Sequence, residues 1–141
     1  MTVPLSATRL GAIAFAGSLL LASAAAAQKL ENIGQTSVGT PVFLEARSVT
    51  RGNGIVTATV RVRLQPPLKH PMGDLRSSRT IAMYDCTKQT VATKESWYYL
   101  DDAGKKVGMH KSIKLPGFGP SFKGSLADVA MRYLCSTPPP R

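Results

Sequence analysis

The stretch IVTATVRVRLQ, residues 55–65, decides the fold that this sequence predicts. Its apolar and polar residues alternate without a break. One set comprises Val56, Ala58, Val60, Val62 and Leu64, and the other comprises Thr57, Thr59, Arg61, Arg63 and Gln65. Alternation with a period of two is typical of a β-strand that has one face in the core and the other in water. We therefore expect a half-buried strand here, with its arginines on the water side.

Turn residues on both sides of this strand predict further strands. Gly52-Asn53-Gly54 precedes it, and these residue types tolerate the positive φ that tight hairpins need. Pro66, Pro67 and Pro71 follow it and predict an irregular excursion. Beyond these signals, stretches of strand-forming residues are expected as strands at residues 42–47, 77–86, 90–100 and 105–109. Consecutive strands joined by tight turns predict an antiparallel meander.

The segment after Pro120 changes to helical spacing. The residues that fall on one helical face are Phe122, Leu126, Val129, Ala130 and Tyr133. Ser125 followed by Asp128 has the form of a capping box, and the prolines at 138–140 cannot continue a helix, so the helix should end near Cys135. The predicted fold class is therefore α+β, an open antiparallel sheet of about five to six strands with one C-terminal helix packed on one face.

Residues 1–27 have the three parts of a secretory signal peptide. Arg9 precedes an apolar run over residues 10–22, and Ala25-Ala26-Ala27 forms a small-residue cleavage site. The alternative, a transmembrane anchor, is disfavoured because the run is shorter than the roughly 20 residues needed to cross a bilayer. We expect a removed signal peptide at 1–27, one domain at 28–137 and a Pro-rich tail at 138–141. The protein should then be exported, periplasmic or secreted, without a lipid anchor or a transmembrane segment in the mature chain.

Export gives a meaning to the two cysteines, Cys86 and Cys135. In an oxidising compartment a single pair is expected to form a disulfide, which here would pin the helix to the sheet. Closing a loop of about 50 residues stabilises a fold by roughly 4 kcal/mol in the chain-entropy account. The alternative is a redox or metal-binding role. The absence of a C-x-x-C pair, and of a histidine at ligand spacing, disfavours it.

Short motifs follow one another in an order that resembles a known family. They are Val42-Phe43-Leu44-Glu45, Ser48-Val49, Arg76-Ser77-Ser78, Tyr84-Asp85-Cys86, Trp97-Tyr98-Tyr99, Asp102-Ala103-Gly104-Lys105 and Leu134-Cys135. Over residues 39–135 this succession resembles the surface-adhesin protein E family. The resemblance implies a small sheet with a disulfide-held C-terminal helix, a place at the bacterial envelope and attachment to host matrix proteins. The chain lacks the lipidation cysteine of the best-known member, and it has Glu45 where the family usually has Asp.

Positive charge is the remaining functional signal, since 18 Lys and Arg face 8 Asp and Glu for a formal net charge of +10. One window without acids, between Glu45 and Asp74, contains Arg47, Arg51, Arg61, Arg63 and Lys69. A second, between Asp102 and Asp128, contains Lys105, Lys106, Lys111, Lys114 and Lys123. These residues either form a cationic surface for polyanions or are solvated side chains that keep an exported protein soluble. The binding candidates are Arg61, Arg63, Tyr98, Lys105 and Lys106.

The aromatic triplet leaves two interpretations open. Trp97 and Tyr99 must lie on the strand face opposite to Tyr98, so one set should enter the core and the other should be exposed or at an edge. An exposed aromatic beside lysines would be a binding anchor. Nucleic acid is a poor candidate partner, because Asp101 and Asp102 follow the triplet where basic residues would be needed.

Catalysis is not predicted. Neither His70 nor His110 stands beside a second titratable group in a pattern that specifies a reaction, so no catalytic residue, metal site or cofactor is expected. The first hypothesis is a non-catalytic binding module for a macromolecular partner, either a host matrix protein or an anionic envelope or glycan polymer. The second is a periplasmic envelope structural or assembly protein. A homodimer is left open.

Overall fold

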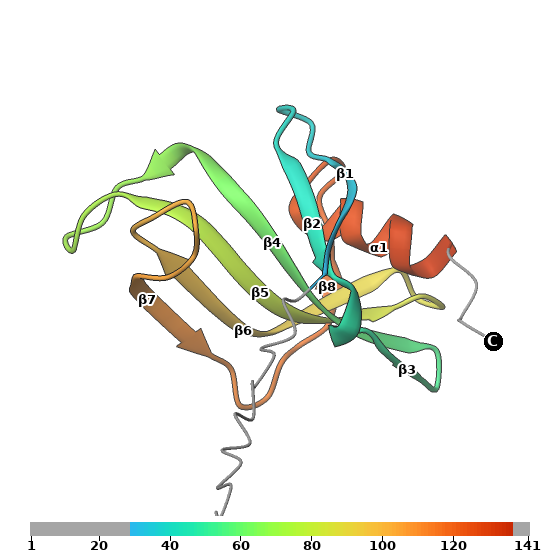
Figure 1. Cartoon of the computed structure of the whole chain (residues 1–141). Coiled ribbons are helices and arrows are strands. Elements are labelled where there is room, and N and C mark those ends of the chain that lie inside the picture. Colours follow the sequence, from blue (N-terminus) through green and yellow to red (C-terminus); the bar gives the residue numbers. More distant parts are fainter. Residues whose placement is uncertain (1–28, 137–141) are drawn as a thin grey trace, which may run out of the picture.

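A computed structural model describes residues 29–136 and contains, in that range, an eight-stranded antiparallel sheet and one α-helix. The strands are β1 (Leu30–Gln35), β2 (Pro41–Glu45), β3 (Thr50–Gly52), β4 (Ile55–Leu68), β5 (Leu75–Asp85), β6 (Thr90–Tyr99), β7 (Val107–Ser112) and β8 (Gly119–Pro120), and the helix is α1 (Leu126–Ser136). Their order is β1-β2-β4-β5-β6-β7, with β3 beside β4 and β8 beside β6 (Figure 1). The predicted α+β fold is confirmed, with eight strands where five to six were predicted.

Two expected segments, the signal peptide at 1–27 and the Pro-rich tail at 138–141, lie outside the described residues. Within residues 29–136, no helix is long and apolar enough to cross a membrane. The export of the protein therefore stays a prediction from its sequence.

The strands that sequence patterning misses are short or irregular. β1 has no clean alternation, because its pairing with β2 shifts register between Asn32 and Gly34. β8 comprises only Gly119 and Pro120. β4 is longer than predicted and continues through Pro66 and Pro67. Its ladder with β5 is irregular between Arg63 and Leu68. Proline has no N–H to donate to a ladder, so this irregular stretch can accommodate both prolines.

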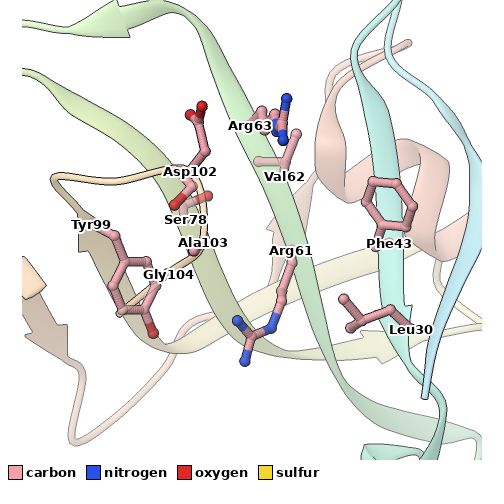
Figure 2. A pocket seen from close by; sticks show the side chains of 11 residues that line it. Leu30, Phe43, Arg61, Val62, Arg63, Ser78, Tyr99, Asp102, Ala103 and Gly104 are labelled. Carbon is pink, nitrogen blue, oxygen red and sulfur yellow. The ribbon is translucent and has the colours of Figure 1, made fainter. Parts of the chain in front are cut away.

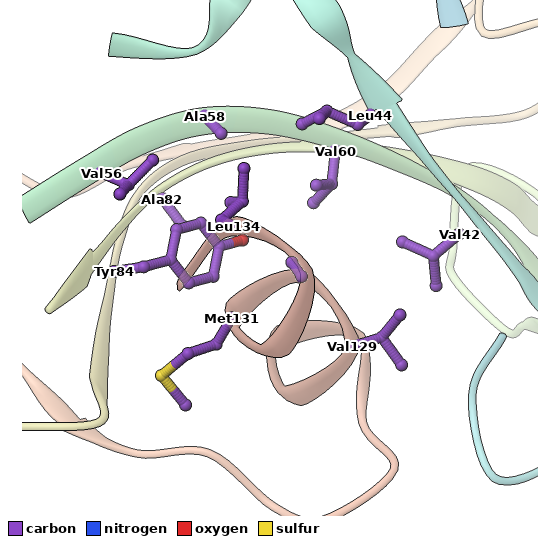
Figure 3. Packing of buried hydrophobic residues seen from close by; sticks show 11 residues of the cluster. Val42, Leu44, Val56, Ala58, Val60, Ala82, Tyr84, Val129, Met131 and Leu134 are labelled. Carbon is purple, nitrogen blue, oxygen red and sulfur yellow. The ribbon is translucent and has the colours of Figure 1, made fainter. Parts of the chain in front are cut away.

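The core lies between one face of the sheet and α1 (Figure 3). The sheet contributes the apolar set predicted from the alternation in β4, joined by neighbours on β2 and β5, and α1 contributes the side chains that face them. These buried residues are Val42, Leu44, Val56, Ala58, Val60, Ala82, Tyr84, Val129, Ala130, Met131 and Leu134. Burying a valine, leucine or methionine side chain stabilises a fold by about 1.5–3 kcal/mol. Within residues 29–136, no α-helix packs on the opposite face of the sheet, which we call the helix-free face.

The start of α1 is set by its cap. Ser125 Oγ accepts the N–H of Asp128 at 3.2 Å, which is one of the two bonds of a capping box. The Asp128 carboxylate reaches one residue further back, and its Oδ2 accepts the N–H of Gly124 at 2.8 Å instead of that of Ser125. Phe122 was expected on the apolar helix face, and that expectation is wrong: it precedes the helix and is 86% exposed. Gly124 has φ 77°, so the chain turns sharply before the cap and leaves Phe122 outside.

The end of α1 is bonded to the sheet twice. The predicted disulfide joins Cys86, just after β5, to Cys135 with a Cα–Cα distance of 5.3 Å. Arg51 Nη1 donates to the carbonyl oxygen of Leu134 at 2.9 Å, where an unpaired helix carbonyl favours a cation. The covalent link between sheet and helix is therefore confirmed.

The alternation in β4 predicts that the polar side chains of the helix-free face are in water, but some of them are buried. Thr59 is buried and Arg61 is half-buried. A 3-10 turn at Ala46–Ser48 separates β2 from β3, both of which pair with β4. Ser48 Oγ accepts the N–H of Thr59 at 2.8 Å and donates to the carbonyl oxygen of Glu45 at 2.6 Å. The turn thus keeps the end of β2 against β4.

Candidate functional site

The helix-free face carries one row of side chains that crosses five strands in register. Phe43 pairs with Arg61, Arg61 with Arg79, Arg79 with Trp97, and Trp97 with His110. Side chains at paired positions of neighbouring strands point to the same face and contact one another. We call these five residues the cross-strand row.

A buried carboxylate stabilises the cationic part of this row. Glu45 Oε1 accepts from Arg61 Nε at 2.7 Å and from Arg79 Nε at 2.6 Å, and its Oε2 accepts from Arg79 Nη2 at 2.9 Å. The side chain of Glu45 is 1% exposed, against 30% for Arg61 and 22% for Arg79. A buried charge needs such paired, hydrogen-bonded partners, because an uncompensated one costs several kcal/mol.

The proton equilibrium of Glu45 follows from these contacts. Burial alone would raise the pKa of this carboxyl, but the hydrogen bonds from Arg79 and Arg61 outweigh it, and the pKa is lowered. The same pair raises the pKa of Arg79, chiefly through its hydrogen bond to Glu45. Glu45 is therefore ionised at neutral pH, and its charge compensates part of the charge of the two arginines.

The aromatic part of the row is a stack. The rings of Trp97 and His110 lie 4.9 Å apart with an interplanar angle of 14°, and the Arg79 guanidinium lies 4.9 Å from the Trp97 ring. His110 Nε2 lies 2.7 Å from Glu95 Oε1, at the side of the stack. Trp97 is thus held between a guanidinium and an imidazole, and this stacking fixes its ring on the sheet.

A hollow of about 270 Å³ opens beside the row, under the turn between β6 and β7. Figure 2 shows Arg61 and Tyr99 at this hollow, with Asp102, Ala103 and Gly104 of the turn around it. A Cβ on Gly104 would lie 3.1 Å from Arg61 Nη1, and its φ of 68° also favours glycine. Ser77 Oγ donates to the carbonyl oxygen of Asp101 at 2.6 Å, which holds the turn on the sheet.

The fold and this geometry can be compared with known proteins. Residues 29–136 match the family model of surface-adhesin protein E. The chain belongs to this family. The family predicted from the motif order is therefore confirmed. No curated protein sequence matches the chain significantly.

Two crystal structures of Haemophilus influenzae protein E have the same fold as this adhesin E-family chain. Crystal form II superposes with a TM-score of 0.53 at 15% identity, covering 72% of this chain and 85% of that one. The selenomethionine form superposes with a TM-score of 0.52 at 14% identity, covering 73% of this chain and 84% of that one. At this level of identity the likeness establishes the fold, while the family match comes from the sequence.

The adhesin E fold separates the binding candidates. Arg61 and Arg63 lie on β4 beside the hollow. The turn at residues 102–104 borders the same hollow and leads to Lys105 and Lys106. Tyr98 lies on the other face of the sheet, because it pairs with Ser78 and Met109 rather than joining the cross-strand row. Arg61 and Arg63 therefore border the hollow, Lys105 and Lys106 directly follow the turn residues that border it, and Tyr98 lies on the other face of the sheet.

The turn itself is organised by Asp101. Its carboxylate accepts the N–H groups of Lys105 at 3.0 Å and of Lys106 at 3.1 Å. These backbone hydrogen bonds, that of Lys106 most of all, lower the pKa of Asp101. Both lysine side chains are exposed, and neither forms an ion pair within residues 29–136.

Several basic residues of the first acid-free window, between Glu45 and Asp74, form bonds within the protein that the sequence does not reveal. Arg51 caps α1, Arg61 holds Glu45, and Lys69 pairs with Asp74 at 2.9 Å. Arg47 and Arg63 remain exposed without an ion pair in the described part of the chain. A count of basic residues therefore overestimates the charge that this window offers to a partner.

Sequence reasoning missed Arg79 and the role of His110. Each stands on its own strand, and only the strand register brings both to Trp97. The signal available was the alternation of β5 and β6, which places every second residue on the helix-free face. Within residues 29–136, no group of three His, Cys, Asp or Glu side chains is arranged to hold a metal ion.

Proposed function

We propose that this adhesin E-family protein is a non-catalytic, exported binding module that attaches to an anionic macromolecule through its helix-free face. The observation that carries the proposal is the exposed Arg63 at the hollow, together with the exposed Lys105 and Lys106, which directly follow the turn residues Asp102, Ala103 and Gly104 that border it. Membership of a surface-adhesin family supports a role in attachment. The ligands that fit are acidic regions of host matrix proteins and sulfated or phosphorylated polymers.

Arg61 has a different part in this proposal from the other cations. It donates to the buried Glu45, so its replacement would disturb the sheet as well as the surface. Arg63, Lys105 and Lys106 are exposed and form no ion pair within residues 29–136, so their charges can be reversed with little effect on the fold. They are the residues with which the proposal is tested.

The test is retention on a heparin column as salt is raised. The variant Arg63→Glu/Lys106→Glu should elute at clearly lower salt than the wild type, because attraction to a polyanion is screened and depends on these charges. The matched control is Lys88→Glu/Lys94→Glu, which makes the same change in net charge at exposed positions, the β5–β6 turn and the middle of β6. Equal elution of the two variants would leave net charge as the cause and refute a local site.

The second candidate function is an envelope structural or assembly role in the periplasm, with the same surface turned to a bacterial component. Cell fractionation separates the two. Protein found only in the periplasmic fraction, and not accessible to antibody on intact cells, would contradict adhesion to a host. Export, the cleavage site after Ala27 and a homodimer stay predictions that the same preparations can check by mass spectrometry and gel filtration.

A further inference from the structure

The segment that links β7 to α1 has an unusual composition. It runs over residues 111–123, starting with the last two residues of β7, and lies entirely within the second window without acids, between Asp102 and Asp128. Its lysines are Lys111, Lys114 and Lys123, and its large apolar residues are Ile113, Leu115, Phe118 and Phe122. We call it the basic-apolar segment. Neither the core nor the surface proposed to bind an anionic macromolecule uses it.

Its apolar side chains are in water. Leu115 is 91% exposed and Phe122 is 86% exposed, while Ile113 and Phe118 are close to half exposed. All three lysines are exposed too. Isolated apolar side chains on a surface are ordinary, but a run of them in one segment marks a surface that contacts something apolar.

The segment is also held in place rather than free to fold back on the core. The N–H of Ile113 donates to the carbonyl oxygen of Lys94 at 2.9 Å, and β8 pairs with the start of β6. Figure 1 shows the chain leaving β7, looping at the edge of the sheet and returning to β8. Lys111, Ile113 and Phe122 border one hollow of about 450 Å³, so residues from both ends of the segment lie close together.

We propose that the basic-apolar segment docks on an anionic lipid bilayer. The apolar side chains would enter the boundary between headgroups and acyl chains, and the lysines would lie among anionic headgroups, as in other interfacial anchors. The combination of exposed apolar side chains and lysines favours an anionic bilayer over a soluble polyanion. A soluble polyanion attracts lysines but gains nothing from exposed Leu and Phe, whereas a bilayer with anionic headgroups attracts both. This surface is separate from the one proposed to bind an anionic macromolecule.

The experiment is co-sedimentation of the whole exported domain with vesicles of phosphatidylcholine, with and without one-third phosphatidylglycerol. Wild-type protein should sediment with the anionic vesicles and much less with the neutral ones. Leu115→Ser/Phe122→Ser should weaken binding by about tenfold or more, the effect of withdrawing two large apolar side chains from the interface. Replacing one segment lysine by Gln should weaken binding by about fivefold at low salt.

Matched controls make the result specific. Val38→Ser/Leu68→Ser removes two exposed apolar side chains elsewhere, and Lys88→Gln removes an exposed charge elsewhere. Both should sediment like the wild type. All replaced side chains are exposed, so unchanged urea midpoints are expected and show that the variants are folded.

Two outcomes overturn the proposal. One is no sedimentation of the wild type with anionic vesicles, and the other is sedimentation that the segment variants and the control variants reduce equally. Heparin retention of Leu115→Ser/Phe122→Ser should equal that of the wild type, since no charge changes. The vesicle experiment and the heparin experiment therefore test the two proposed binding surfaces independently.

Discussion

Replacing Glu45 by Gln should destabilise the fold strongly. The substitution keeps the size of the side chain and removes its charge, so Arg61 and Arg79 lose the carboxylate to which their three hydrogen bonds are made. Breaking a buried ion pair by removing one partner costs about 3–5 kcal/mol. The arginines are 30% and 22% exposed and can recover some hydration, so the lower end of that range applies. We expect a loss of about 3 kcal/mol in the free energy of unfolding.

The assay is urea unfolding of the oxidised protein at neutral pH, followed by circular dichroism. The midpoint should fall while the m-value stays the same, which identifies a change of stability rather than of compactness. Glu95→Gln is the matched control, because it removes the same charge from a contact with His110 in which the side chains of Glu95 and His110 are 31% and 44% exposed. Exposed pairs contribute up to about 1 kcal/mol.

The result that would refute the reasoning is a loss for Glu45→Gln no larger than the loss for Glu95→Gln. A double-mutant cycle sharpens this comparison. Arg79→Gln combined with Glu45→Gln should destabilise by clearly less than the sum of the single variants, because both remove the same interaction. Additive losses would show that Glu45 and Arg79 are not coupled.

The other predictions concern acid and packing. The lowered pKa of Glu45 means that its stabilisation is complete above its unfolded pKa and is lost as the pH falls through the folded value, so the urea midpoint should fall below about pH 4.5. In Glu45→Gln that acid-dependent fall should be smaller, and an identical fall in both proteins would contradict the assignment. Gly108→Ala would bring a Cβ to 2.7 Å from the buried Leu75 Cδ2, so a loss of about 1–3 kcal/mol in the same urea assay is expected. Gly117→Ala, with no atom within 4 Å of the added Cβ, should change little, and equal midpoints for the two variants would show that Leu75 can move aside.

Local patterns account for what the sequence could predict. The alternation of residues 55–65 reports the burial of every second side chain, and the cap at Ser125 and Asp128 identifies the helix start. A single cysteine pair leaves one choice of intrachain disulfide. Phe122 was misassigned because helical spacing alone does not show that Gly124 turns the chain before the helix begins.

The cross-strand row could not be predicted from such patterns. Its members come from five strands, and their alignment depends on irregularities, such as the register shift between Ile81 and Ala82. One residue more or less in a strand would move its side chains to the other face. Nor does the sequence show that Glu45 is buried, because that follows from the turn after β2 and from two arginines far along the chain.

The disulfide has a consequence for the products of limited proteolysis of the folded domain. Cys86 and Cys135 enclose β6, β7, β8 and most of α1 in one covalent loop, and the basic-apolar segment is one of its exposed parts. A protease that cuts this segment once would produce two polypeptides that stay joined through sulfur. Such a nicked domain would migrate as one species on a non-reducing gel and as two on a reducing gel.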